Sequence, residues 1–175
     1  SLRALVAPAE LWAVVKADAY GHGALDVAGA TLQAGASALC VATVQEGEEL
    51  RRAHGSVRVL VLGPLAPGED ELARECDLEV TAFRPELPAG LRVHAKLDTG
   101  MGRWGMSPDE LAEVPPERVI GLMSHLATAD EADDAFVAQQ LERFLLLAAR
   151  FPGTIRHLAN SAAAIRHPGC RLDAV

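Results

Sequence analysis

The chain has few cysteines, few aromatic residues and no long apolar run. Its three cysteines, Cys40, Cys76 and Cys170, are an odd number without a close pair, so they indicate neither a disulfide framework nor a metal or redox site. No apolar run approaches the roughly 20 residues that span a bilayer, and the N-terminus does not resemble a signal peptide. These absences favour a protein of the reducing cytoplasm and give no support for a membrane span or a bound metal.

Basic residues are scarce as well. The sequence holds 16 Lys and Arg against 24 Asp and Glu, a formal net charge of -8. Proteins that bind nucleic acid or anionic membranes through charge carry the opposite excess. We therefore expect a small-molecule ligand, with neither nucleic acid nor a membrane as partner.

Small aliphatic side chains, by contrast, are abundant. Half of the 175 residues are apolar and only 4% are aromatic, so a core has to pack Ala, Val and Leu. The length fits one domain.

Apolar runs alternate with amphipathic stretches, which predicts a parallel α/β sheet. We expect strands at residues 11–15, 38–44, 57–62, 78–83, 92–97, 119–126, 154–160 and 170–175, and helices at residues 25–34, 45–53, 67–75, 108–114 and 135–151.

These eight expected strands favour a closed (β/α)8, TIM-like barrel over the alternative, an open doubly wound sheet. Such barrels typically need about 250 residues. Only Arg84–Gly90 joins two expected strands, although a parallel crossover usually takes a dozen residues or more. Pro115 and Pro116 likewise end a helix early. We therefore expect missing segments near residues 84–90 and 114–117, and a fragment whose two ends look cut.

Lys16 is the first candidate for chemistry. It follows the apolar run Leu11–Val15 and precedes a glycine-rich turn, the place where α/β folds bind ligands. Partial desolvation there favours a nucleophilic amine that can form a Schiff base with a carbonyl cofactor. Tyr20, four residues on, can donate its phenol to a phosphate. The alternatives are a solvated lysine and an aromatic side chain at the rim; His22 is expected to be a turn residue.

A second polar cluster lies on the strand expected at residues 92–97. Side-chain alternation puts His94, Lys96 and Asp98 on one face, where charges need partners. The glycines that follow let the chain turn, so that Arg103 can direct its guanidinium at an oxygen or a carboxylate. This pattern favours a ligand site; a structural network of ion pairs is the alternative.

Two further polar groups end expected strands. His125 can stack on a planar ring or hydrogen-bond a neighbour, although a strand-end histidine is often only structural. Asn160 or Ser161 can cap the next helix, whose first N–H groups favour an anion; capping without a ligand is the alternative. A lysine after the first strand and a helix N-terminus after the seventh together suit a phosphorylated carbonyl compound such as pyridoxal 5'-phosphate.

Four segments resemble motifs of the alanine racemases. They are residues 13–23 (AVVKADAYGHG), 96–103 (KLDTGMGR), 124–130 (SHLATAD) and 159–161 (ANS), in family order and across almost the whole chain. The resemblance implies the N-terminal, pyridoxal-phosphate-binding barrel domain of that family, here residues 1–175, without its C-terminal β-rich domain.

The resemblance also implies residue roles. Lys16 would bind the cofactor and act in catalysis, and Tyr20 and Ser161 would contact its phosphate, with Asn160 beside them. Arg103 would hydrogen-bond the phenolic oxygen of the cofactor. Lys96 matches a lysine that is carbamylated in many members and orients that arginine, and His125 would lie beside the pyridine ring.

The implied reaction interconverts L- and D-alanine. Lys16 would hold the cofactor as a Schiff base and then move the α-proton on one face. In the family, a tyrosine from the partner subunit acts on the other face. We therefore expect a homodimer, a second base outside this chain and poor racemisation by these 175 residues alone. A role in D-alanine supply for peptidoglycan follows. The alternatives are a non-enzymatic, single-barrel protein that binds pyridoxal phosphate and a racemase of another small amino acid.

Overall fold

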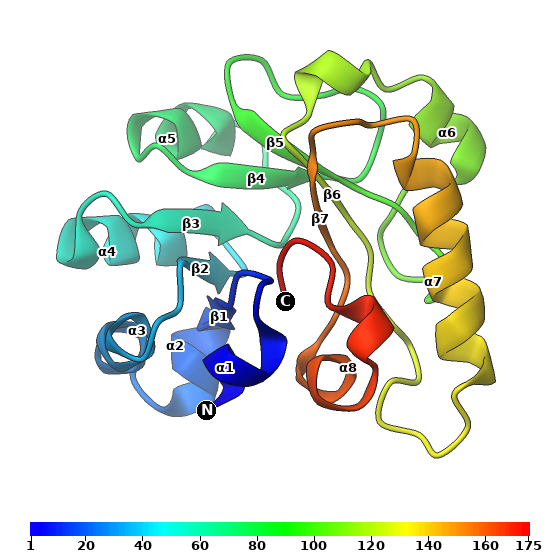
Figure 1. Cartoon of the computed structure of the whole chain (residues 1–175). Coiled ribbons are helices and arrows are strands. Elements are labelled where there is room, and N and C mark those ends of the chain that lie inside the picture. Colours follow the sequence, from blue (N-terminus) through cyan, green and yellow to red (C-terminus); the bar gives the residue numbers. More distant parts are fainter. The chain divides into compact units, whose positions relative to one another are not determined.

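The computed structural model describes residues 1–175 and shows strands alternating with helices along the chain (Figure 1). The chain divides into two compact units. The first unit comprises residues 11–81 and 88–93, and the second comprises residues 1–10, 82–87 and 94–175. The predicted alternation is confirmed, and the strand pairs within each unit are parallel.

The first unit is built on strands that pair in chain order. β1 pairs with β2, β2 with β3 and β3 with β4. Every residue of β2 is buried, as parallel strands covered on both faces require. α4 packs against β2 and β3. The elements are β1 (Trp12–Val14), α2 (Lys16–Gly21), α3 (Ala24–Gln33), β2 (Ala38–Val41), α4 (Val44–His54), β3 (Arg58–Val61), α5 (Glu69–Glu75) and β4 (Glu79–Ala82).

α4 is fixed at both ends by side-chain hydrogen bonds. Thr43 Oγ1 accepts from the backbone N–H of Glu46, and the Glu46 carboxylate accepts from the backbone N–H of Thr43, a reciprocal capping box. In the last turn, the Arg51 guanidinium donates to the carbonyl oxygens of Cys76 and Asp77 at 2.7 and 2.8 Å. These contacts join α4 to the chain that enters β4.

A buried ionic cluster lies where the strands of the first unit begin. Glu79, the first residue of β4, is almost fully buried, and its Oε1 lies 3.2 Å from Arg58 Nε and 3.4 Å from Arg92 Nε. The Arg58 guanidinium stacks over the Trp12 ring at 5.5 Å. Asp77 also pairs with Arg92, and this hydrogen bond holds the pKa of Asp77 below its usual value. Two arginines thus neutralise a carboxylate that would otherwise be an unpaired buried charge.

The second unit pairs β5 with β6 and β6 with β7. Its longest helix, α7, turns Val137, Gln140, Phe144 and Ala148 inward at helical spacing. The elements are α1 (Leu2–Val6), β5 (Arg92–Lys96, shared with the first unit), α6 (Pro108–Ala112), the 3-10 turn η1 (Pro116–Arg118), β6 (Gly121–Met123), α7 (Ala135–Ala148), β7 (Ile155–His157), α8 (Ser161–Arg166) and the 3-10 turn η2 (Pro168–Cys170).

The eighth predicted strand is wrong. The 3-10 turn η2 takes up Cys170, and the residues after it form only isolated bridges, between Ala174 and both Glu10 and His157. The Asp173 side chain explains the interruption. Its carboxylate accepts the backbone N–H of Arg156 at 2.8 Å as well as two bonds from the Arg156 guanidinium. A side chain thus replaces a backbone acceptor that a regular ladder would supply.

The two short connections are as the sequence suggests. No helix forms between β4 and β5, and the prolines after α6 lead into η1 within a few residues. The strands β6 and β7 are shorter than predicted, because their ends pass into the polar loops described below.

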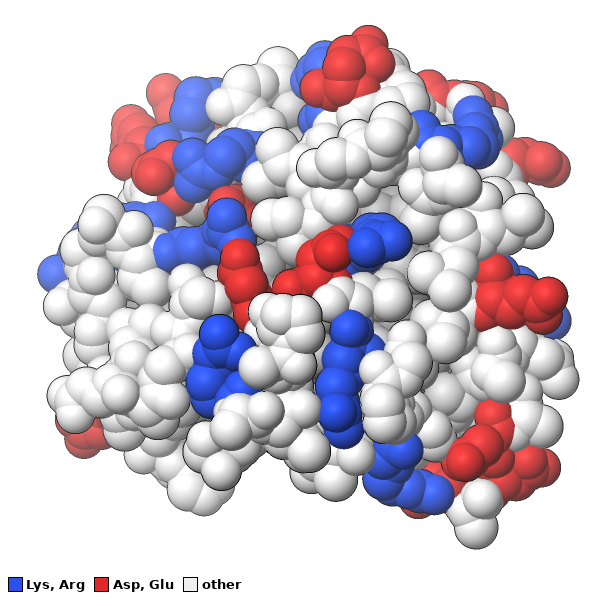
Figure 2. All heavy atoms as spheres, viewed as in Figure 1, with Lys and Arg blue, Asp and Glu red and all other residues white.

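The surface carries charges of both signs. On the face drawn in Figure 2, acidic and basic side chains are interspersed among uncharged ones, without a continuous basic stretch. None of the helices combines the length and apolar character that a membrane span requires.

The backbone of β6 leaves no room for a side chain at Gly121. A Cβ there would lie 2.0 Å from Nδ1 of His94, a fully buried ring held by a hydrogen bond to His157. We expect Gly121→Ala to lower the free energy of unfolding by about 3 kcal/mol or more, the upper range for overpacking, in urea titrations followed by circular dichroism.

Gly29→Ala is the matched control, because a Cβ at this α3 position meets only His54 Cε1, at 3.6 Å. It should be neutral or stabilise the protein by up to about 1 kcal/mol through helix propensity. Equal effects of the two substitutions would contradict the packing argument.

Candidate active site

Lys16 follows directly on the last ladder hydrogen bond of β1. Val15 N–H donates to the Cys40 carbonyl of β2 at 2.8 Å, and the next residue is Lys16, which is half-buried. The structure thus places this lysine at the C-terminal end of its strand, as predicted. In parallel α/β folds this is the end at which ligands bind.

The segment after Lys16 is a left-handed turn. Ala17, Asp18, Ala19 and Tyr20 have φ values of 52, 53, 51 and 56°. Left-handed backbone is unfavourable for L-residues by about 1–2 kcal/mol each, so the surroundings must hold it. Two carboxylates do so: Glu46 Oε1 accepts the Ala17 N–H at 2.7 Å, and Asp18 Oδ1 accepts the Ala24 N–H at 2.7 Å.

Tyr20 ends this turn with its side chain in solvent. The residue is 61% exposed, which leaves its phenol accessible to a ligand. Gly21 and Gly23 follow with φ of 84 and 90°, values that favour glycine. His22 is a turn residue, as predicted: its backbone N–H and its ring Nδ1 both contact the Ala19 carbonyl. Lys16 and Tyr20 therefore share one short, heavily hydrogen-bonded segment.

Lys96 is the last residue of β5, and it is buried. Its Nζ donates to the carbonyl oxygen of Arg103 at 3.1 Å and lies 5.6 Å from the centre of the Phe83 ring. Burial lowers the pKa of Lys96 to about 8; the positive charge of Arg103 acts in the same direction and Asp98 opposes it. The amine is therefore partly neutral near pH 8. The contact of Lys96 with Arg103 runs to the backbone carbonyl of that residue, and the predicted role of Lys96 in orienting the Arg103 side chain stays a prediction.

Asp98 does not pair with Lys96 through a direct contact. Its carboxylate instead accepts the backbone N–H groups of Gly100, Met101 and Gly102 at 2.8 to 3.1 Å. Burial acts against ionisation of Asp98, but these three donors outweigh it and hold its pKa below the usual value. Gly105 lets the returning chain approach, since a Cβ there would lie 2.7 Å from Asp98 N. The loop that carries the exposed Arg103 is thus folded around a carboxylate.

His125 lies just after β6, where a polar network fixes the backbone. Gln140 of α7 donates to the His125 carbonyl at 3.1 Å and to Thr99 Oγ1 at 3.0 Å, and its Oε1 accepts the Ala127 N–H. Thr99 also contacts Ser124 at 2.9 Å. No role was predicted for Gln140 from the sequence. A lone amide among apolar residues at helical spacing was the available signal.

Asn160 and Ser161 lie after β7, at the start of α8. Asn160 Oδ1 accepts the Ala163 N–H at 3.0 Å, and the Asn160 carbonyl accepts the Ala164 N–H. The backbone N–H groups of Ser161 and Ala162, ahead of them, keep their hydrogen-bonding capacity, and Ser161 is exposed. The predicted cap is confirmed, and it leaves donors that suit an anion.

The structure also reveals a buried histidine pair that the sequence did not indicate. His94 Nδ1 and His157 Nε2 lie 2.9 Å apart, with the rings near-perpendicular at 73°. Both rings are buried, and Gly121 provides the space. The residues are 63 positions apart, so no local pattern links them.

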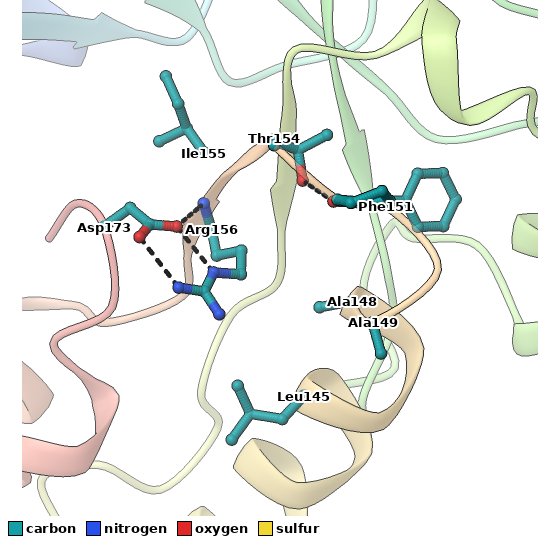
Figure 3. Close-up of a pocket in the computed structure, with 10 residues that line it drawn as sticks. Leu145, Ala148, Ala149, Phe151, Thr154, Ile155, Arg156 and Asp173 are labelled. Atoms are coloured by element: carbon teal, nitrogen blue, oxygen red, sulfur yellow. Dashed lines mark hydrogen bonds and ion pairs between the residues drawn. The ribbon is translucent and has the colours of Figure 1, made fainter.

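The candidate residues lie at or beyond the C-terminal ends of strands, and a hollow lies elsewhere. Lys16 and Tyr20 belong to the first unit, and the remaining candidates belong to the second. The hollow, about 570 Å³, lies at the opposite end of β7, beside the Arg156–Asp173 ion pair and the end of α7 (Figure 3). None of the predicted site residues lines it.

The comparison with known proteins settles the family. The family described as "Alanine racemase, N-terminal domain" matches residues 1–175. The chain belongs to this family. Its fold is accordingly the barrel fold of that domain, with the strand–helix alternation described above.

Curated relatives and solved structures agree. The chain is 40% identical over 199 positions to the alanine racemase of Desulforamulus reducens, covering 99% of this chain and 54% of that protein. It is 44% identical over 188 positions to that of Symbiobacterium thermophilum, covering 94% and 50%. The solved alanine racemase of Clostridium difficile 630 superposes with a TM-score of 0.91 at 29% identity, over 99% of this chain and 52% of that one.

The chain spans about half the length of the relatives it matches. One alignment extends over 199 positions, more than the 175 residues of the chain, so that relative carries residues with no counterpart here. This difference supports the expected shortening, although its location near residues 84–90 and 114–117 stays a prediction.

The buried amine of Lys96 should titrate well below an ordinary lysine. Since Lys16 and Lys96 are the only lysines, side-chain 13C labelling of lysine gives two NMR signals, which Lys96→Met assigns. In buffer free of CO2, where the Lys96 amine is not carbamylated, we expect its signal to titrate with a midpoint of about 8; a midpoint near 10.5 would contradict the burial argument. Between pH 8 and 10.5 the unfolded chain binds the additional proton, so the stability of the wild type should rise with pH relative to Lys96→Met.

Proposed function

We propose that this chain is the cofactor-binding barrel domain of a pyridoxal-phosphate-dependent racemase that interconverts L- and D-alanine. The main support for this proposal is the position of Lys16. In a chain that matches the alanine racemase domain along its whole length, this lysine stands at the C-terminal end of β1, on a turn that is held by charged hydrogen bonds.

The donor set suits pyridoxal 5'-phosphate. The Lys16 amine provides the group that condenses with an aldehyde. Each unit offers donors that suit a phosphate: the exposed Tyr20 phenol in the first unit, and the backbone N–H groups of Ser161 and Ala162 with the Ser161 hydroxyl in the second. When bound, the cofactor supplies an electron sink that stabilises the charge left after α-proton removal.

In this proposal, Lys16 is both the attachment point and an acid–base group. Its Nζ would take the α-proton from one face of alanine and return it to the same face. Inversion requires a second acid–base group on the opposite face. We propose that a partner subunit of a homodimer supplies it, and that the D-alanine formed serves peptidoglycan synthesis in the cytoplasm.

The other candidate residues position groups around this chemistry. Lys96 holds the Arg103 carbonyl and Asp98 holds three N–H groups of the same loop, which fixes the point from which the Arg103 guanidinium extends. The Arg103 side chain is proposed to bind the phenolic oxygen of the cofactor, and the half-buried His125 to lie beside the pyridine ring. Carbamylation of Lys96 is part of the same proposal.

Reductive trapping tests the proposal directly. The chain is mixed with pyridoxal 5'-phosphate, reduced with borohydride and mapped by peptide mass spectrometry. We expect one adduct per chain at Lys16, lost in Lys16→Arg and kept in the matched variant Lys96→Arg. Because only two lysines are present, an adduct at Lys96 or at the N-terminus instead of Lys16 would contradict the assignment.

Hydrogen exchange then separates a racemase from a non-catalytic cofactor carrier. L-Alanine incubated in D2O with the loaded protein should gain an α-deuterium, and Lys16→Arg should abolish the exchange. Stoichiometric trapping at Lys16 without any α-exchange would favour the carrier. Exchange with serine or another small amino acid at a higher kcat/KM than with alanine would overturn the substrate assignment.

A further inference from the structure

We propose that Glu46 is a positioning residue for Lys16. Its carboxylate, carried by the first turn of α4, holds the left-handed turn that starts directly after the lysine. This inference rests on the proposed role of Lys16, and the contacts behind it lie entirely within the first unit.

The Glu46 carboxylate accepts three backbone N–H groups from two segments of the chain. Oε1 accepts the N–H of Ala17 at 2.7 Å, across 29 positions of sequence. Oε2 accepts the N–H of Ala42 at 2.6 Å and that of Thr43 at 3.3 Å, just beyond the end of β2. One side chain therefore couples the exit of β1 to the exit of β2 and the start of α4.

A carboxylate suits this position better than any neutral side chain. Its two oxygens face separate donors, and charge-assisted bonds to backbone N–H groups are about twice as strong as neutral ones. A glutamine amide has one oxygen, so its NH2 group would face a backbone N–H on one side. An aspartate is one methylene shorter and cannot reach both donor sets from the same backbone position.

The contact with Ala17 acts on the direction of Lys16. The Ala17 nitrogen belongs to the peptide group that follows Lys16, so fixing it restricts rotation about the Cα–C bond of the lysine. The next four residues occupy left-handed backbone that L-residues disfavour. Without the carboxylate, relaxation of the turn toward ordinary backbone angles would redirect the lysine and remove Tyr20 from its place.

The capping role of the same side chain needs a separate control. Glu46 also completes the capping box of α4 with Thr43, so a loss of helix stability could be mistaken for a loss of positioning. Thr43→Ala removes the cap contact to Glu46 N–H and leaves the Glu46 carboxylate on Ala17. Glu49→Gln changes an exposed carboxylate on the same helix and serves as the charge control.

Amide hydrogen exchange of the cofactor-free chain is the first measurement. In Glu46→Gln we expect the peptide covering residues 16–23 to exchange about tenfold faster or more, the loss anticipated for one hydrogen bond to a charged group. Thr43→Ala should accelerate exchange only in α4, and Glu49→Gln in neither segment. If Glu46→Gln unfolds the chain, Glu46→Asp, which keeps the charge, replaces it.

The second measurement is the rate of reductive trapping by pyridoxal 5'-phosphate. We expect trapping at Lys16 to slow about tenfold in Glu46→Gln and to be unchanged in Thr43→Ala. The positioning role would be overturned if both substitutions slowed trapping equally, or if amide exchange of residues 16–23 were unchanged in Glu46→Gln. Absence of trapping in the wild type would reject the proposed function instead, while the exchange data would still decide whether Glu46 holds the turn.

Discussion

Parallel ladder hydrogen bonds that continue past the strands fix the backbone at three of the candidate residues. Val15 N–H still bonds to β2 one residue beyond β1, Leu97 N–H bonds to Met123 beyond β5, and Ser124 N–H bonds to His157 beyond β6. A residue that follows such a bond has little freedom in where its Cα lies. Lys16, Asp98 and His125 each follow one of them. Their placement is therefore a consequence of backbone pairing, before any side chain contributes.

Carboxylates at the two ends of the strands in the first unit have different partners. Where they begin, Glu79 is neutralised by Arg58 and Arg92, and these charges are fully used in pairing. Where they end, the carboxylate of Glu46 accepts backbone N–H groups and does not form an ion pair with the Lys16 amine. An amine held in an ion pair would be a poorer nucleophile. Because the Glu46 carboxylate is hydrogen-bonded to backbone N–H groups and not paired with Lys16, the Lys16 amine can stay reactive.

The sequence was sufficient to predict where the first seven strands lie, because apolar runs and the glycines after them are local signals. It did not predict the residues at which they end, since β6 and β7 stop short of their predicted ends. It predicted Lys16 after β1, Lys96 on β5 and Asn160 as a helix cap, where the structure has them, whereas His125, which falls inside the strand predicted at residues 119–126, lies beyond the end of β6. The histidine pair and the contact between Glu46 and Ala17 join residues 63 and 29 positions apart, which no period of 2 or 3.6 can indicate. The eighth strand failed for a similar reason: an apolar pattern does not show that the Asp173 carboxylate will occupy a neighbouring strand's N–H.

The left-handed turn after Lys16 shows where local preference and tertiary structure disagree. Alanine, aspartate and tyrosine all prefer right-handed or extended backbone, yet four such residues in succession have φ above 50°. At about 1–2 kcal/mol each, that is an unfavourable local free energy of roughly 4–8 kcal/mol, a large fraction of the stability of an ordinary domain. A sequence free of functional demands would place glycine there. Retaining these side chains makes sense if Tyr20 must face a ligand and the small alanines must let the chain coil tightly beside it, with the charged bonds of Glu46 and Asp18 offsetting part of the strain.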